Sequence, residues 1–199
     1  MKLLKTLLAT AVAVSAMPAM AYEAGDFMIK AGVINVSPKD DNSADLGGGA
    51  RVQIEDDTQL GLTFTYMISS QIGLEVLAAT PFTHEVKIDG MGKVGEVSHL
   101  PPTVSLQYYP MSPESAIQPY VGVGINYTFF FDEKDAVNHV DRSTGAAFSV
   151  GANYNIDDNW MANVAVWKID LDATAQTALD AVDLHVDPWV VLVGGGYKF

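Results

Sequence analysis

The 199-residue chain carries 24 Asp and Glu residues against 11 Lys and Arg, which gives a formal net charge of −13 at pH 7. This excess argues against a nucleic-acid partner, because binding phosphates requires clustered basic side chains. The absence of Cys excludes disulfide bonds and thiolate metal sites. Hydrophobic residues make up 49% of the chain, and Val, Ile, Tyr, Phe and Thr gather in short runs, which is typical of many strands and few helices.

The N-terminus has the features of a secretory signal peptide. Two lysines precede an apolar run at residues 7–14, and an Ala-Met-Ala cleavage pattern ends at Ala21. A retained membrane anchor is the alternative, but the run is shorter than the ~20 apolar residues that span a bilayer. We therefore predict a signal peptide over residues 1–21 and one mature domain over residues 22–199. Removing the leader changes the formal charge to −15, because it contains two basic residues and no acidic one.

Eight stretches of the remaining chain place an apolar residue at every second position. In the second stretch, Leu60, Leu62 and Phe64 alternate with Gly61 and Thr63. A period of two puts the apolar side chains on one face of a β-strand. In chain order, the stretches are residues 27–33, 59–68, 72–78, 99–108, 121–129, 146–154, 160–167 and 189–199. Eight is an even number, as bacterial outer-membrane barrels require.

The connections between these stretches alternate in length. The long connections are residues 37–57, 83–98, 132–142 and 170–184, and the short ones are residues 69–70, 111–118 and 155–159. Transmembrane barrels keep short turns on the periplasmic side and long loops outside the cell. Both ends of the mature chain are therefore expected in the periplasm.

The aromatic residues distinguish a membrane barrel from a soluble one. A lipocalin-like barrel places its apolar residues inside. Here Tyr66, Tyr154, Trp189 and other aromatic residues share the apolar face and lie near strand ends, like the aromatic girdles of outer-membrane barrels. The opposite face carries residues such as Asn126 and Asn153, which are too polar for a soluble barrel's core. We predict an all-β, eight-stranded antiparallel transmembrane β-barrel, exported through the periplasm to the bacterial outer membrane.

Several motifs resemble the outer membrane protein W (OmpW) family. They are QLGLTFTYM at residues 59–67, IGLEVLAATPFTH at 72–84, HLPPT at 99–103, PYVGVGINYT at 119–128, DPWV at 187–190 and GYKF at 196–199. The motifs follow one another in the order of that family, whereas residues 37–57 and 132–142 match it poorly. The resemblance implies a barrel with a narrow, partly hydrophobic lumen and passive uptake of small hydrophobic or amphipathic molecules.

Two charged residues are expected to meet inside the barrel. Lys30 and Glu75 lie on the inward face, each at the fourth position of its stretch. Opposite charges at one height can pair across a narrow lumen and so offset their desolvation. Above them, Leu77, Trp167 and Val190 also face inward. These residues form either an apolar vestibule above a charged plug or simply the filling of a barrel too narrow to stay open.

Pro101 and Pro102 interrupt the fourth stretch. Proline has no backbone N–H and is found at edges and bulges of sheets. Two adjacent prolines remove donors toward both neighbouring strands, because successive residues point their N–H groups to opposite sides. We predict a lateral opening here, through which an apolar solute leaves the lumen for the lipid. The alternative is a bulge near the outer rim that only shapes the strand.

The four histidines provide no sign of a metal or catalytic site. His84, His139 and His185 fall in or beside the expected outer loops, and His99 faces inward near the prolines. No pair has ligand-like spacing, and we predict solvated loop histidines. Ser98 precedes His99, but adjacent strand residues face opposite sides, and no other motif supplies a nucleophile with its base and acid. We therefore expect no metal, no cofactor and no enzymatic activity.

The chain ends on an aromatic pair, Tyr197 and Phe199, which looks like the C-terminal signal read by the barrel-assembly machinery. The expected partners are that machinery, outer-membrane lipids with lipopolysaccharide, and small apolar solutes. The expected function is passive uptake of those solutes. The alternative is a structural, adhesive or receptor barrel that acts through its extracellular loops.

Overall fold

The computed structural model describes residues 21–38, 52–88, 92–135, 137–140, 142–177 and 181–199. Side chains are described for residues 21–38, 55–83, 98–130, 142–171 and 186–199. The expected signal peptide lies outside the described residues except for Ala21.

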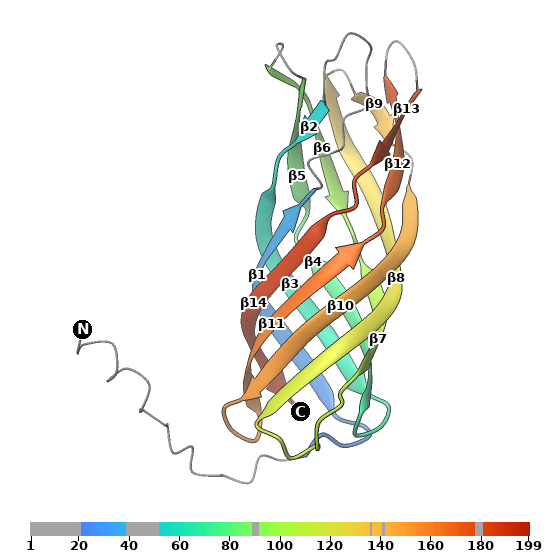
Figure 1. Ribbon diagram of the computed structural model, residues 1–199. Helices are drawn as coiled ribbons and strands as arrows, with labels where there is room; N and C mark the ends of the chain where they lie inside the picture. Colours follow the sequence, from blue (N-terminus) through green and yellow to red (C-terminus); the bar gives the residue numbers. More distant parts are fainter. Residues whose placement is uncertain (1–20, 39–51, 89–91, 136, 141, 178–180) are drawn as a thin grey trace, which may run out of the picture.

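Eight antiparallel strands close into a barrel (Figure 1). They are β1 (Phe27–Ser37), β3 (Asp57–Met67), β4 (Ile72–Ala79), β7 (Thr103–Tyr108), β8 (Ile117–Asp135), β10 (Ser143–Asn155), β11 (Trp160–Ile169) and β14 (Trp189–Lys198). Each strand pairs with the next in this order, and β14 pairs with β1 to close the ring. The predicted eight-stranded antiparallel barrel is confirmed.

Strand alternation separates a lipid-facing surface from the interior. On β8, Ile125 is 63% exposed and Asn126 is fully buried; on β10, Val150 is 62% exposed and Ser149 only 4%. A continuous apolar exterior of this kind suits the hydrocarbon of a bilayer. Within the described parts of the chain, no helix is long and apolar enough to cross a membrane.

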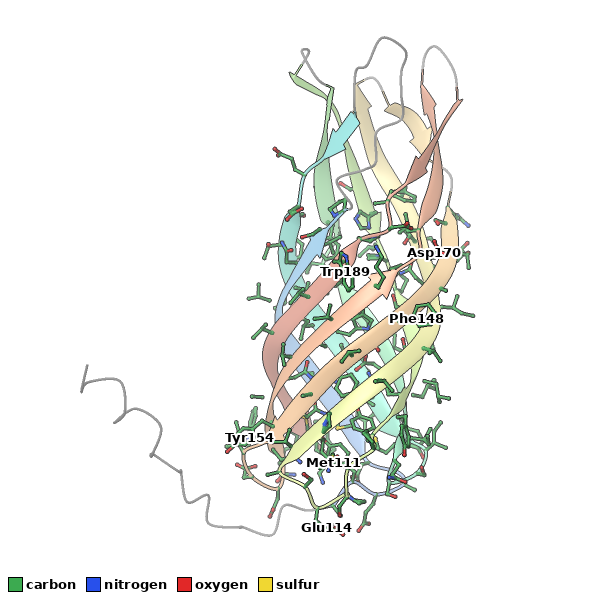
Figure 2. The ribbon with its side chains drawn as sticks, in the orientation of Figure 1. Met111, Glu114, Phe148, Tyr154, Asp170 and Trp189 are labelled. Atoms are coloured by element: carbon green, nitrogen blue, oxygen red, sulfur yellow. The ribbon has the colours of Figure 1, made fainter. Side chains whose placement is uncertain are left out.

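Exposed aromatic residues mark the two ends of this surface. Tyr154 lies toward the end that holds the termini, and Trp189 lies toward the opposite end (Figure 2). Trp160, Tyr197 and Phe199 pack edge to face near the first end, with ring centroids of consecutive members 5.0 and 4.7 Å apart. Their positions match the aromatic girdles expected at the water–lipid boundaries.

The wall continues past the membrane strands at the end opposite the termini (Figure 1). The additional strands are β2 (Val52–Ile54), β5 (Phe82–Ile88), β6 (Gly92–Leu100), β9 (Val137–Val140), β12 (Asp172–Thr177) and β13 (Ala181–His185). Long loops were expected from the sequence over most of these residues, and this expectation is wrong because they form strands. These strands satisfy their backbone groups by pairing with each other, which does not require the apolar face that defines a lipid-facing strand.

Candidate functional site

The interior near the termini contains a buried ion pair. Lys30 on β1 places its Nζ atom 2.7 Å from Glu75 Oε2 on β4, and both side chains are fully enclosed. Thr65 on the intervening strand β3 donates its hydroxyl to the same carboxylate oxygen at 3.1 Å. The Lys30 ammonium also lies 5.0 Å from the centre of the Tyr120 ring. The charges expected to meet inside the barrel therefore do so, and each has a compensating partner.

Three buried tyrosines surround this pair and close the lower lumen. The Tyr109 ring centroid lies 5.5 Å from that of Tyr22 and 5.2 Å from that of Tyr120. Asn153 Nδ2 donates to the Tyr22 hydroxyl at 3.0 Å, and Asn163 Nδ2 donates to the Tyr120 hydroxyl at 3.2 Å. We call the ion pair and the three tyrosines the floor. The floor separates the apolar part of the lumen from the end that holds the termini.

Tyr22 precedes the first alternating stretch, and no sequence pattern points to its role. Its backbone N–H donates to the Pro113 carbonyl at 3.3 Å, and its hydroxyl donates to Asn155 Oδ1 at 3.4 Å. Lys198 Nζ lies 5.5 Å from the centre of the Tyr22 ring. These contacts join residues far apart in the chain, so a local pattern could not reveal them.

Above the floor, apolar side chains line part of the interior, beside buried polar ones such as Asn126 and Ser149. Leu77, Trp167 and Val190 are 3%, 0% and 2% exposed, and they face inward from β4, β11 and β14. Trp167 lies opposite Val190 in the register of the two strands. Ile34 and Leu192 belong to the same cluster of buried hydrophobic residues. These side chains make this part of the lumen more apolar than the floor.

The wall of the barrel is interrupted beside Pro101 and Pro102. Pairing of β4 with β7 ends at Leu77 and Thr103, and pairing of β5 with β6 begins at Phe82 and His99. Residues 78–81 and residues 100–102 lie between these two paired stretches, and we call this pair of segments the seam. Four residues face three across the seam, so the register shifts by one. Pro81 belongs to the seam as well, a residue the sequence interpretation did not single out.

The two prolines lack donors toward both neighbouring strands, as expected, but backbone pairing is interrupted on one side only. Toward β8, the register runs unchanged from Tyr108 opposite Val121 to Ser98 opposite Phe131. The Tyr127 N–H donates to the Pro102 carbonyl at 3.0 Å and keeps this side of the ladder in place. A missing proline donor removes only half of such a rung, because the proline carbonyl still accepts.

His99 is not the solvated loop residue that the sequence suggested. It is 7% exposed and lies beside two aromatic rings, with centroid distances of 5.4 Å to Phe82 and 5.9 Å to Phe130. His84, His139 and His185 lie in strands β5, β9 and β13, and their side chains are outside the described set. Among the described residues, no group of three His, Asp or Glu side chains could hold a metal ion.

The C-terminal aromatic pair lies on the lipid-facing side. Phe199 is 66% exposed, and its backbone N–H donates to the Phe27 carbonyl at 2.8 Å. The Phe199 and Tyr197 rings are 4.7 Å apart. The terminal residue is thus ordered by the first strand yet accessible from outside the barrel.

A family model described as the OmpW family matches residues 23–199. Outer membrane protein W of Vibrio cholerae is 40% identical over 210 residues, which cover 96% of this chain and 97% of that protein. The crystal structure of the outer membrane protein OprG from Pseudomonas aeruginosa is 41% identical, has a TM-score of 0.80 and covers 90% of this chain and 98% of that one. The dibenzothiophene metabolism operon protein PahQ of Pseudomonas aeruginosa is 24% identical over 163 residues, 76% of each chain.

Proposed function

This chain belongs to the OmpW family of bacterial outer-membrane β-barrels, and we propose that it mediates passive uptake of small hydrophobic or amphipathic molecules. In this proposal the solute enters the apolar upper lumen, leaves sideways through the seam and enters the outer-membrane lipid. The partners are the solute, the surrounding lipid with its lipopolysaccharide, and the assembly machinery that inserts the barrel.

The observation that carries the proposal is the combination of a closed floor with a one-sided seam. Below Leu77, an apolar solute would meet the buried charges of Lys30 and Glu75, and it would have to displace tyrosines that are hydrogen-bonded in place. Disrupting such a network leaves polar groups unpaired, which costs ~1–3 kcal/mol for each group. Movement into lipid keeps the solute in an apolar environment, so the side exit is favoured over the floor.

The name of one relative is consistent with the proposal that the solute is apolar. PahQ is named for an operon of dibenzothiophene metabolism, and dibenzothiophene is an uncharged aromatic compound. A solute of that kind matches a lumen lined by Leu77, Trp167 and Val190.

The two prolines allow a test with a matched control. Because the Pro102 carbonyl pairs with β8, a Pro102→Val substitution would place its new N–H toward β8. Pro101 is the next residue, so a Pro101→Val substitution would place its N–H across the seam. Each restored bond should add about 1 kcal/mol to the stability of the barrel, but only Pro101→Val should draw the two sides of the seam together.

Uptake of N-phenyl-1-naphthylamine, an apolar dye that fluoresces in lipid, should be measured in intact cells with equal amounts of folded barrel. We expect slower uptake with Pro101→Val and unchanged uptake with Pro102→Val. Equal uptake by all three proteins would reject the lateral route. A channel that passes straight through the floor, or a structural or receptor role of the outer strands, would then be the better account.

A further inference from the structure

The backbone hydrogen bonds around the seam identify the rung that is missing. In an antiparallel sheet, the N–H and C=O of one residue face the same neighbour, and those of the next residue face the other. The Pro102 carbonyl faces β8, where it accepts from Tyr127, so Pro101 faces the seam. On the other side, the Thr80 N–H donates to Leu60 on β3 at 3.0 Å, so Ala79 faces the seam.

Ala79 and Pro101 would form the next rung of the ladder. The register of β4 with β7 places Leu77 opposite Thr103, and two further residues place Ala79 opposite Pro101. In that rung the Ala79 N–H would donate to the Pro101 carbonyl. Pro101 has no N–H to return, so the rung would contain one hydrogen bond where a normal rung contains two.

The Pro101 carbonyl has another donor, on the lumen side. Asn126 on β8 is fully buried, and its Nδ2 atom lies 3.2 Å from the Pro101 carbonyl oxygen and 3.4 Å from that of Pro102. The same amide donates to Thr103 Oγ1 at 2.9 Å, and the Thr103 hydroxyl in turn donates to the Pro101 carbonyl at 3.3 Å. Thr128 donates its hydroxyl to Asn126 Oδ1 at 2.7 Å, which turns the amide nitrogen toward the prolines.

We propose that Asn126 is a positioning residue for the lateral opening. Its amide takes the place of the Ala79 N–H as donor to the Pro101 carbonyl, and so holds the proline segment against β8 and away from β4. This inference rests on the proposed lateral route for its functional meaning, but its structural part can be tested without transport.

Replacing Asn126 removes the competing donor. In Asn126→Leu the Pro101 carbonyl would be buried without that partner, a state that is unfavourable. The Thr103 hydroxyl, at 3.3 Å, would be its remaining donor. A carbonyl oxygen accepts two hydrogen bonds, and the Ala79 N–H across the seam can supply the second, so the lower register should extend upward by at least one residue pair. Asn126→Asp has nearly the same size and can still accept from Thr128. Burial disfavours the ionised form of a carboxyl, so this variant is assayed at alkaline pH, where the ionised carboxylate cannot donate to the carbonyl.

A pair of introduced cysteines reports directly on this register. Extending the lower register would bring Thr80 opposite Leu100, whereas the register above the seam places Pro81 opposite Leu100. The Thr80–Leu100 pair would not share backbone hydrogen bonds, so its Cα atoms would lie ~4.5 Å apart, within the range of a disulfide. The chain has no cysteine of its own, so Thr80→Cys with Leu100→Cys forms one defined crosslink.

Crosslinking of this double-cysteine protein by mild oxidant should rise several-fold when Asn126→Leu or Asn126→Asp is added. Asn163→Leu is the matched control, because Asn163 is also a buried, hydrogen-bonded asparagine but lies on β11, away from the seam. It should reduce stability without changing the crosslinked fraction. If both Asn126 variants fail to fold, Thr128→Val removes only the bond that orients the amide and should raise crosslinking more weakly.

Crosslinking and dye uptake, measured together, separate this inference from the proposed function. Increased crosslinking with slower uptake of N-phenyl-1-naphthylamine supports both. Increased crosslinking with unchanged uptake supports the role of Asn126 in the seam and rejects the lateral route. Unchanged crosslinking in folded Asn126 variants overturns the role of Asn126, even if Pro101→Val slows uptake.

Discussion

At the scale of single residues, the floor shows how a charge is kept inside a narrow barrel. Lys30 is compensated by Glu75 at 2.7 Å and by the face of Tyr120. The Thr65 hydroxyl donates a hydrogen bond to one oxygen of the Glu75 carboxylate. A buried ion pair adds little net stability compared with apolar residues of the same size, but removing one partner leaves an uncompensated charge.

Glu75→Gln should therefore destabilise the barrel by about 3–5 kcal/mol, because it leaves the Lys30 ammonium buried without its counter-charge. Urea unfolding of the refolded protein in detergent, followed by tryptophan fluorescence, measures this loss. The double substitution Lys30→Met with Glu75→Leu removes both charges and should recover most of the stability. A Glu75→Gln protein as stable as the wild type would show that Lys30 is neutral or solvated in the folded barrel.

At the scale of strands, the eight membrane-spanning elements could be predicted because lipid enforces alternation. Every second residue of β8 and β10 must be apolar, and the period is visible without knowing the partner strand. The outer strands β6 (GKVGEVSHL) and β12 (DATAQT) lack an unbroken alternation of large apolar residues, so the same signal is weak there. Their pairing depends on residues far apart in the chain.

Some residues of the candidate site could be predicted from the sequence and others could not. The inward position of Lys30 and Glu75 follows from counting along two strands. Tyr22 and Asn126 could not be recognised, because their roles depend on the end of a neighbouring hairpin and on the carbonyls of another strand. Pro101 and Pro102 could be recognised because proline has no backbone N–H. That backbone pairing is interrupted toward β4 but not toward β8 follows only from the strand register.

The C-terminal strand offers a test of recognition against stability. Deleting Phe199 removes one backbone hydrogen bond, to Phe27, and the ring contacts with Tyr197 and Phe27. We expect a small loss in refolding yield in detergent and a much larger loss of assembled barrel in cells, because the exposed ring is the proposed contact of the assembly machinery. Heat-modifiable gel mobility measures both yields. Equal losses would mean that Phe199 acts through stability alone.

At the scale of the whole molecule, the three tryptophans lie in three places: at each end of the lipid-facing surface and inside the lumen. Trp160 and Trp189 are 56% and 52% exposed on the lipid-facing surface, whereas Trp167 is fully enclosed in the lumen. Trp160 begins β11 and contacts Tyr197 near the end that holds the termini. Trp189 lies toward the opposite end of the lipid-facing surface (Figure 2). The chain has no other tryptophan.

Single-tryptophan proteins, made by Trp→Phe substitution of the other two, should therefore differ in quenching by brominated phospholipids. With bromine placed near the headgroups, fluorescence from Trp160 and from Trp189 should be strongly quenched. Fluorescence from Trp167 should be almost unaffected, because the barrel wall separates it from lipid. Strong quenching of Trp167 would contradict the assignment of the inner face.

The one-residue shift at the seam also divides the wall into parts that can open independently. The β5–β6 hairpin is joined to β8 and β2, but its register does not continue into that of β4 and β7. Regions with separate hydrogen-bond ladders often unfold as separate cooperative units. Amide hydrogen exchange should then proceed in two steps, with the β5–β6 amides exchanging well before those of β4 and β7. A single exchange rate across all four strands would mean that β8 alone couples the two parts, and that the outer half of the barrel opens only when the membrane-embedded half does.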